Sequence, residues 1–227
     1  MLLTKFFARR GYLRKPRDGF TLLKEGWGAK LGLTNAVHVG AHLAEERAVY
    51  EALGFFDVLW IEASTTIYQN LVRDLAKPTP AKTRHVAVNA FASDLAGEEL
   101  KLLHFSNEGS SNSIYAATPL FRETWPTIGE TGVAEAVTTD TADRIAAAHG
   151  FTSADLLAVD VQGAELLVLR GAEGLLKTAK AVIVEVSMHP YYDGGALQPD
   201  VRDFLRNRGF MEIRRPPNHG DQLYIRA

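Results

Sequence analysis

The fold of this chain is decided by Asp155-Leu-Leu-Ala-Val-Asp160-Val-Gln-Gly-Ala-Glu165. Here an apolar run ends in a carboxylate and a glycine just before a helical pattern. A buried parallel strand presents polar groups to a ligand in this way at its carboxyl end. The upstream segment Val37-His-Val-Gly40-Ala-His42 repeats the pattern of an apolar run followed by a glycine turn. Together they predict a parallel sheet with a ligand site along one edge.

Strands and helices alternate along most of the chain, which favours a mostly parallel sheet with helices on both faces. An extra strand over residues 99–105 is expected to pair with residues 135–138. The stretch 106–132 is rich in Ser, Asn, Thr, Pro and Gly, and its length predicts a functional loop or lid. The other expected strands cover residues 36–39, 58–61, 85–89, 156–159, 181–186, 210–214 and 223–225. The expected helices cover residues 45–53, 65–75, 139–149, 164–169, 172–177 and 200–208.

Composition limits the class of protein. The 227 residues suffice for one sizeable domain, which we place at 36–227 after an N-terminal helical extension over 1–35. The formal net charge of −2 gives no reason to expect a nucleic acid partner. The chain has no cysteine, which excludes disulfides, thiolate nucleophiles and cysteine-based metal sites.

The first 15 residues are basic and also contain Leu and Phe, but they lack the uninterrupted apolar core of a signal peptide. We interpret them as a helix packed on the domain; peripheral contact with a membrane surface through residues 1–15 is the alternative. No apolar run approaches the roughly 20 residues of a membrane-spanning helix. A cytoplasmic location is the default expectation.

The second strand ends in Glu62, which lies 22 residues after Gly40. That spacing suits a carboxylate binding the ribose of a nucleoside cofactor, either a nicotinamide or S-adenosylmethionine (SAM). The turn after Gly40 lacks the further glycines that admit a pyrophosphate, and Glu45 and Glu46 would repel one. SAM carries a positive sulfonium and no phosphate, so it is the favoured cofactor. A nicotinamide-dependent reductase is the less favoured alternative, since no Tyr-x-x-x-Lys pair is found in the expected helix.

Several motifs, in this order along the chain, resemble the FkbM-type SAM-dependent methyltransferases from residue 36 to the C-terminus. They are Gly40-Ala-His, Trp60-Ile-Glu62-Ala, Asn112-Ser-Ile, Thr138-Thr-Asp-Thr, Asp160-Val-Gln-Gly-Ala-Glu165, Leu169-Arg-Gly-Ala and Val184-Glu-Val-Ser. The resemblance implies an α/β, Rossmann-like class I methyltransferase fold. Its seven-stranded sheet is mostly parallel with an antiparallel last strand and helices on both faces. It also implies methylation of a hydroxyl on a small-molecule or glycan acceptor, such as a sugar or secondary metabolite.

Two positions depart from the family pattern. His38 stands where many members carry Asp, and Ala44 replaces the usual glycine after the loop. A catalytically inactive SAM-binding or scaffold domain therefore stays open as an alternative.

Glu62 is expected to accept hydrogen bonds from both ribose hydroxyls, since only a carboxylate accepts two in this way. The backbone at Gly40 and Ala41 would approach the methionine end of the cofactor, and Ser93 and Asp94 would contact adenine. The full set of expected cofactor-binding residues is His38, Gly40, Ala41, His42, Glu62, Ala63, Ser93, Asp94, Asp160 and Gln162.

Asp160 and His189 are the candidate catalytic residues. Asp160 could orient the methionine amino group or the acceptor hydroxyl. His189 could take the acceptor proton, because an unperturbed histidine has a pKa of about 6.5. Asp160, Glu185 and His189 could also bind Mg²⁺, but the sequence lacks a dense acidic cluster and we expect no metal. The expected acceptor-binding residues are Asn112, Ser113, Glu185, His189 and Tyr191.

Overall fold

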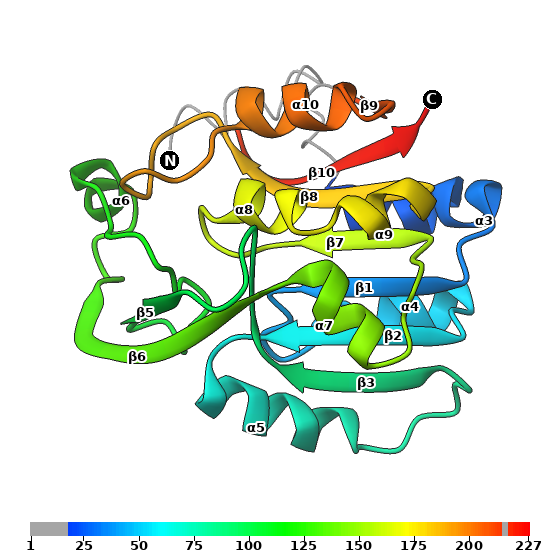
Figure 1. The fold of residues 1–227 in the computed structure, drawn as a ribbon, viewed down its shortest axis with the longest axis horizontal. Coiled ribbons are helices and arrows are strands. Elements are labelled where there is room, and N and C mark those ends of the chain that lie inside the picture. The colour runs from blue at the N-terminus through cyan, green and yellow to red at the C-terminus, as the bar shows by residue number, and fades with distance from the viewer. Residues whose placement is uncertain (1–17, 215–217) are drawn as a thin grey trace, which may run out of the picture.

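The computed structural model describes residues 18–214 and 218–227, and its main feature is a seven-stranded sheet of order β3-β2-β1-β7-β8-β10-β9 (Figure 1). Neighbours from β3 to β8 are parallel, whereas β10 is antiparallel to both β8 and β9. This topology confirms the class I methyltransferase fold that the sequence resemblance implied. The strands are β1 (Asn35–Val39), β2 (Asp57–Glu62), β3 (Arg84–Asn89), β7 (Leu156–Val159), β8 (Ala181–Ser187), β9 (Phe210–Glu212) and β10 (His219–Arg226).

Side chains alternate along each strand, so apolar side chains lie on both faces of the sheet. Helices cover both faces and bury these side chains. Val37 and Val39 point into one apolar core, and Ala36 and Trp60 belong to the other. The first core is closed by α7 (Ala142–Ala148), α8 (Glu165–Arg170), α9 (Glu173–Thr178) and α10 (Gln198–Arg206). The second is closed by α2 (Gly19–Leu22), the π-helical turn η1 (Leu23–Trp27), α3 (Gly28–Leu31), α4 (Arg47–Leu53) and α5 (Thr65–Leu75).

A three-stranded sheet of order β4-β6-β5 lies beyond the carboxyl ends of the parallel strands (Figure 1). It contains β4 (Phe91–Ser93), β5 (Glu99–Phe105) and β6 (Glu130–Thr141). Antiparallel pairing of Glu99 with Thr138 and of Leu102 with Glu135 confirms the predicted partner of the extra strand. The small sheet therefore sits over the edge where the sequence places the ligand.

The structure corrects two expectations in this region. Residues 106–132 are not all loop, because α6 (Pro119–Thr124) begins after Thr118, whose hydroxyl accepts the N–H of Phe121. A Thr N-cap followed by Pro is a helix start signal, so the sequence does indicate this helix. The helix expected from residue 139 begins only at Ala142, because β6 continues through Thr141.

The described part of the N-terminal segment is helical and shares the second apolar core, to which Phe20 and Leu23 contribute. The domain boundary at residue 36 stays a prediction. The membrane-contact alternative for residues 1–15 falls outside the described residues. Within the described ranges, no helix combines the length and the apolar character that crossing a membrane requires.

Candidate active site

A cavity of about 220 Å³ opens at the carboxyl ends of β1, β2 and β7. It is covered by residues 109–114, which follow β5. Seven of the expected cofactor residues line it, namely His38, Gly40, His42, Glu62, Ala63, Asp160 and Gln162. Two of the expected acceptor residues, Asn112 and Ser113, line it as well.

Glu62 lies at the centre of the cavity wall and is 7% exposed. One carboxylate oxygen accepts the backbone N–H of His42 at 2.9 Å, and the other accepts that of Ser64 at 2.8 Å. Burial raises the pKa of Glu62 to about 7 despite these two donors. Each oxygen keeps a lone pair for a further donor, which is what two ribose hydroxyls need.

Gly40 allows the turn after β1 to pass directly against the end of β7. Its φ is +82°, and a Cβ atom at this position would lie 1.6 Å from the carbonyl oxygen of Asp160. Only glycine fits. The same turn holds His42 at φ +42° and Ala44 at φ +60°, conformations that cost energy in residues with a side chain. Ala44, which replaces the usual glycine, therefore adopts a strained backbone conformation.

His42 ties this turn to the segment that covers the cavity. Its Nδ1 lies 2.6 Å from Oε1 of Glu45, and its Nε2 lies 3.2 Å from the carbonyl oxygen of Glu108. The hydrogen bond with Glu45 raises the pKa of His42 to about 9. The ring is thus a cation at neutral pH and donates at both nitrogens.

One end of the cavity is apolar, and most of its residues pack on one another. Its lining residues come from the ends of β2 and β3, from β4 and β5, and from the covering segment. They are Ala63, Ala90, Phe91, Ala92, Leu102 and Ile114.

The charges of the cavity decide between the two candidate cofactors. Among the described residues that line it, none is Lys or Arg, whereas Glu45, Glu46, Asp160 and Asp221 are acidic. His42 is a cationic ring in this lining, but it is already paired with Glu45, so a pyrophosphate would meet the remaining carboxylates with no Lys or Arg to offset them. The same lining suits a sulfonium and an ammonium group, so the residues present fit SAM.

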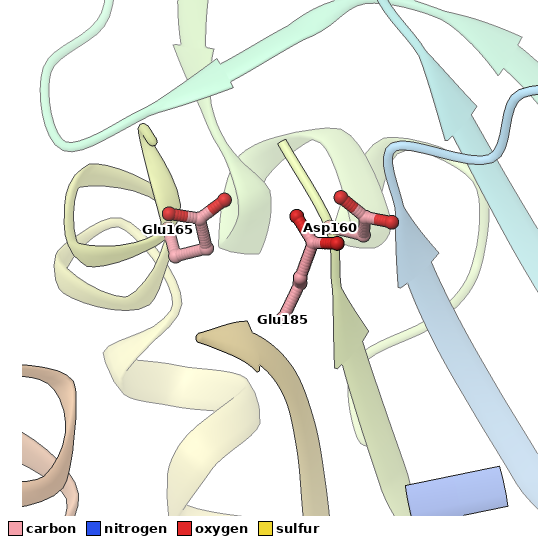
Figure 2. A group of neighbouring side chains, drawn as sticks. All are labelled: Asp160, Glu165 and Glu185. Carbon is pink, nitrogen blue, oxygen red and sulfur yellow. The ribbon is translucent and has the colours of Figure 1, made fainter. Parts of the chain in front are cut away.

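Three acidic side chains meet beside the cavity (Figure 2). Asp160 follows β7 and Glu185 belongs to β8. One carboxyl oxygen of each lies within 4.8 Å of the other, and Nε2 of Gln162 donates to both groups. Burial raises the pKa of both, and for Glu185 the negative charge of Asp160 adds to the effect. Two buried carboxyls in contact retain a proton between them.

Glu165 completes the group and has a structural role. It accepts the backbone N–H groups of Val161 at 3.2 Å and Gly163 at 2.9 Å, which closes the turn after β7. One oxygen from each of Asp160, Glu165 and Glu185 lies within 4.8 Å of the others, so these three could hold a metal ion. Among the described residues, His189 does not belong to this group, and the absence of a metal stays a prediction.

His38 takes the place of the family's carboxylate as a neutral ring. It is 4% exposed, stacks on Trp60 with ring centroids 5.0 Å apart, and has Nδ1 3.0 Å from the hydroxyl of Tyr50. Burial lowers its pKa to about 4. His38 therefore adds no charge to the cavity at neutral pH.

The remaining expected residues lie elsewhere. Glu185, His189 and Tyr191 line a second, smaller cavity of about 20 Å³ under the segment 187–197. His189 is exposed and does not line the first cavity. Ala41, Ser93 and Asp94 also lie outside the lining of the first cavity, and the backbone of Ser93 instead packs against Gly171. Their roles stay predictions.

Several lining residues were not among the expected site residues, and three of them are Phe20, Glu46 and Asp221. Phe20 comes from the N-terminal helices and Asp221 from β10, so no local spacing links them to the glycine turn. Burial raises the pKa of Glu46 and of Asp221 to about 7. Glu46 offered one signal, because it stands beside Glu45 in the turn already assigned to the cofactor.

The fold and the cavity define an α/β enzyme domain for a nucleoside cofactor without a pyrophosphate. The family model described as the methyltransferase FkbM domain matches residues 38–211, which is most of the chain. The chain therefore belongs to the FkbM family of SAM-dependent methyltransferases, which confirms the resemblance seen in the sequence and SAM as the cofactor. No curated protein shows significant similarity to the chain.

Solved methyltransferase structures show a distant likeness. Magnesium protoporphyrin IX methyltransferase from Synechocystis with bound SAM is 10% identical, and the match covers 100% of this chain and 96% of that one, with a TM-score of 0.44. A TehB-like SAM-dependent methyltransferase from Corynebacterium glutamicum is 10% identical, with coverages of 100% and 99% and a TM-score of 0.41. The family assignment rests on the family model.

Proposed function

We propose that this chain transfers the methyl group of SAM to a hydroxyl group of a small-molecule or glycan acceptor, such as a sugar or a secondary metabolite. The observation that carries this proposal is the cavity in which Glu62 and Asp160 flank the Gly40 turn. The preference for oxygen is supported by the family resemblance and by the carboxyl of Asp160, which can interact with an acceptor hydroxyl.

Each part of the cavity has a task in this proposal. SAM, when bound, supplies a methyl carbon already activated by the sulfonium. Glu62 holds the ribose, the apolar end holds the adenine, and the backbone at Gly40 with Asp160 holds the amino acid part. The covering segment 109–114 excludes water, so alignment and desolvation do most of the work.

The acceptor is proposed to lie between the covering segment and the segment 187–197. Asn112 and Ser113 come from the first, whereas Glu185, His189 and Tyr191 come from the second cavity. Asp160 and His189 stay the proposed catalytic residues. A cytoplasmic location stays a prediction from the sequence.

The proposal is tested with SAM carrying a radiolabelled methyl group and pairs of acceptors that differ only in a hydroxyl or an amine. Label in the hydroxyl members supports it, and label only in the amines overturns the preference for oxygen. SAM binding without transfer to any acceptor points to the scaffold alternative. Calorimetric titration with SAM, S-adenosylhomocysteine and NADH runs in parallel, and binding of NADH alone points to the reductase.

A further inference from the structure

Gln162 connects the Asp160–Glu185 carboxyl pair to the segment that covers the second cavity. Its Nε2 donates to Asp160 at 2.5 Å and to Glu185 at 2.9 Å. Its Oε1 accepts the hydroxyl of Tyr192 at 2.8 Å. Its backbone carbonyl accepts the hydroxyl of Ser113 from the segment that covers the first cavity. One residue thus joins the carboxyl pair to both covering segments.

We propose that Gln162 and Tyr192 are positioning residues, which hold Asp160 and Glu185 as one proton-sharing pair, and that this pair takes up the proton of the acceptor hydroxyl. The proposal rests on the proposed function and deepens it. The pair borders the cofactor cavity through Asp160, whereas the exposed His189 does not line that cavity.

The two carboxyl groups favour one orientation of the Gln162 amide, because reversing it would place Oε1 against their oxygens. The Tyr192 side chain is itself fixed, because the ring is buried in an aromatic cluster with Phe105 and Phe121. Gln162 has a φ of +54°, a strained conformation that this network holds in place.

The pair carries one proton in the resting state. Burial raises the pKa of both carboxyls, the charge of Asp160 raises that of Glu185 further, and the hydrogen bond from Gln162 favours the negative charge at Asp160. The protons of such a coupled pair leave in two steps whose pKa values belong to the pair.

Other ionisable groups around the pair affect the pH at which it loses its protons. His219 Nε2 lies 3.6 Å from Oε1 of Glu185, and burial lowers the pKa of His219, so this ring is neutral at pH 7. The cationic His42 is the nearby group that favours a negative charge on Asp160. The carboxyls that oppose a second negative charge on the pair come from the turn after β1, α8 and β10, and are Glu45, Glu165 and Asp221.

The proton balance of the transfer then closes within the site. The O–H bond of the acceptor breaks, its electron pair stays on the acceptor oxygen, and the proton bonds to the ionised carboxylate of the pair. The pair goes from one negative charge to neutral. This change offsets the loss of the sulfonium's positive charge, so the net charge of the buried site is unchanged.

The test begins with the free protein and needs neither cofactor nor acceptor. Asp and Glu are labelled with ¹³C at the carboxyl, and the spectra are followed from pH 4 to 9. Asp160→Asn and Glu185→Gln assign the two signals. In the unmodified protein we expect the two signals to titrate as a coupled pair, with one proton retained well above the ordinary carboxyl pKa of about 4. Separate titration of both near the ordinary value of about 4 overturns the proposal.

Tyr192→Phe keeps the ring and removes only the hydroxyl. The Tyr192 hydroxyl donates to Gln162, and its loss weakens the hydrogen bonds with which Gln162 stabilises the negative charge of the pair. The pKa of the pair should therefore rise by about half a unit. Tyr115→Phe is the matched control, because Tyr115 packs against the same aromatic cluster and its hydroxyl has no hydrogen-bond partner among residues 18–214 and 218–227. An equal shift in both variants overturns the positioning role.

Turnover gives a second measurement once an acceptor is known. The acid limb of the pH dependence of kcat should shift to higher pH in Tyr192→Phe and keep its position in Tyr115→Phe. An acid limb that does not follow the carboxyl titration overturns the proton-uptake role. Failure of the proposed function is distinguishable, since it would show as no methyl transfer to any hydroxyl while the coupled titration persists.

Discussion

Glu62→Gln is the change that tests the cofactor site most directly. The substitution keeps the size of the side chain but turns one carboxylate oxygen into an NH₂ group. In the folded protein this group meets the backbone N–H of either His42 or Ser64, so two donors face each other. The variant also loses one acceptor for a ribose hydroxyl. A hydrogen bond to a charged group contributes about 2 kcal/mol, which corresponds to about a 30-fold weaker dissociation constant.

The pH dependence sharpens this prediction. The pKa of Glu62 is about 7, and only the ionised form accepts both ribose hydroxyls. Binding therefore strengthens as the pH rises through 7, because the binding-competent fraction grows. From pH 6 to pH 8 that fraction increases about tenfold, and the apparent dissociation constant falls by the same factor. Glu62→Gln has no carboxyl at this position, so its affinity should lose this dependence.

The assay is calorimetric titration with S-adenosylhomocysteine at pH 6, 7 and 8. Glu51→Gln serves as the control, because Glu51 binds Arg47 and His85 outside the cavity and its loss should leave the affinity unchanged. Two results would refute the reasoning. One is a Glu62→Gln variant that binds as tightly as the unmodified protein at pH 8. The other is an unmodified protein whose affinity does not change with pH.

Three further predictions concern the turn and the buried carboxyls. His42→Ala removes the clamp on Glu108, so amide hydrogen exchange across residues 106–113 should become faster than in the surface control His149→Ala. Ala44→Gly relieves about 1 kcal/mol of strain and loses a buried methyl group of about 0.8 kcal/mol, so urea unfolding should show almost no net change. A gain or loss above 1 kcal/mol would contradict this balance. Four carboxyls with pKa values raised to about 7 bind protons more tightly in the folded than in the unfolded chain. Their contribution to the free energy of unfolding is complete below about pH 4.5 and is lost as the pH rises through 7. Urea unfolding at pH 5, 6, 7 and 8 should show this contribution falling. These carboxyls are Glu46, Glu62, Glu165 and Asp221.

The parallel half of the fold was predictable because its signals are local. Each buried strand is a short apolar run, and the polar residues that end it must lie at one edge of the sheet. Glu62 and Asp160 could therefore be placed at the same edge from their positions after such runs. The glycine requirement at position 40 also follows locally, although its cause, the carbonyl of Asp160, lies on another strand.

The remaining parts of the site depend on packing between distant segments. Tyr192 meets Gln162 because the segment after β8 folds back against Gly163, where a Cβ atom would lie 3.2 Å from that of Tyr192. Nothing in the local pattern around either residue indicates this contact. Phe20 and Asp221 likewise enter the cavity from the two ends of the described chain. Periodicity and spacing describe single elements, so they do not reveal which loops meet.

The connection between the two sheets has a consequence for how new specificity can arise. β5, α6 and most of β6 belong to one excursion of the chain (Figure 1). Its ends meet where the backbone of Thr139 exchanges hydrogen bonds with Glu98 and Gly97. An insertion whose ends are in contact can change in length and sequence without displacing the strands that flank it. The excursion contributes Leu102 and the covering segment 109–114 to the cavity, while Glu62 and Gly40 belong to the main sheet and its turn. Exchanging residues 98–139 between relatives would therefore change the cover of the cavity and leave Glu62 and the Gly40 turn in place.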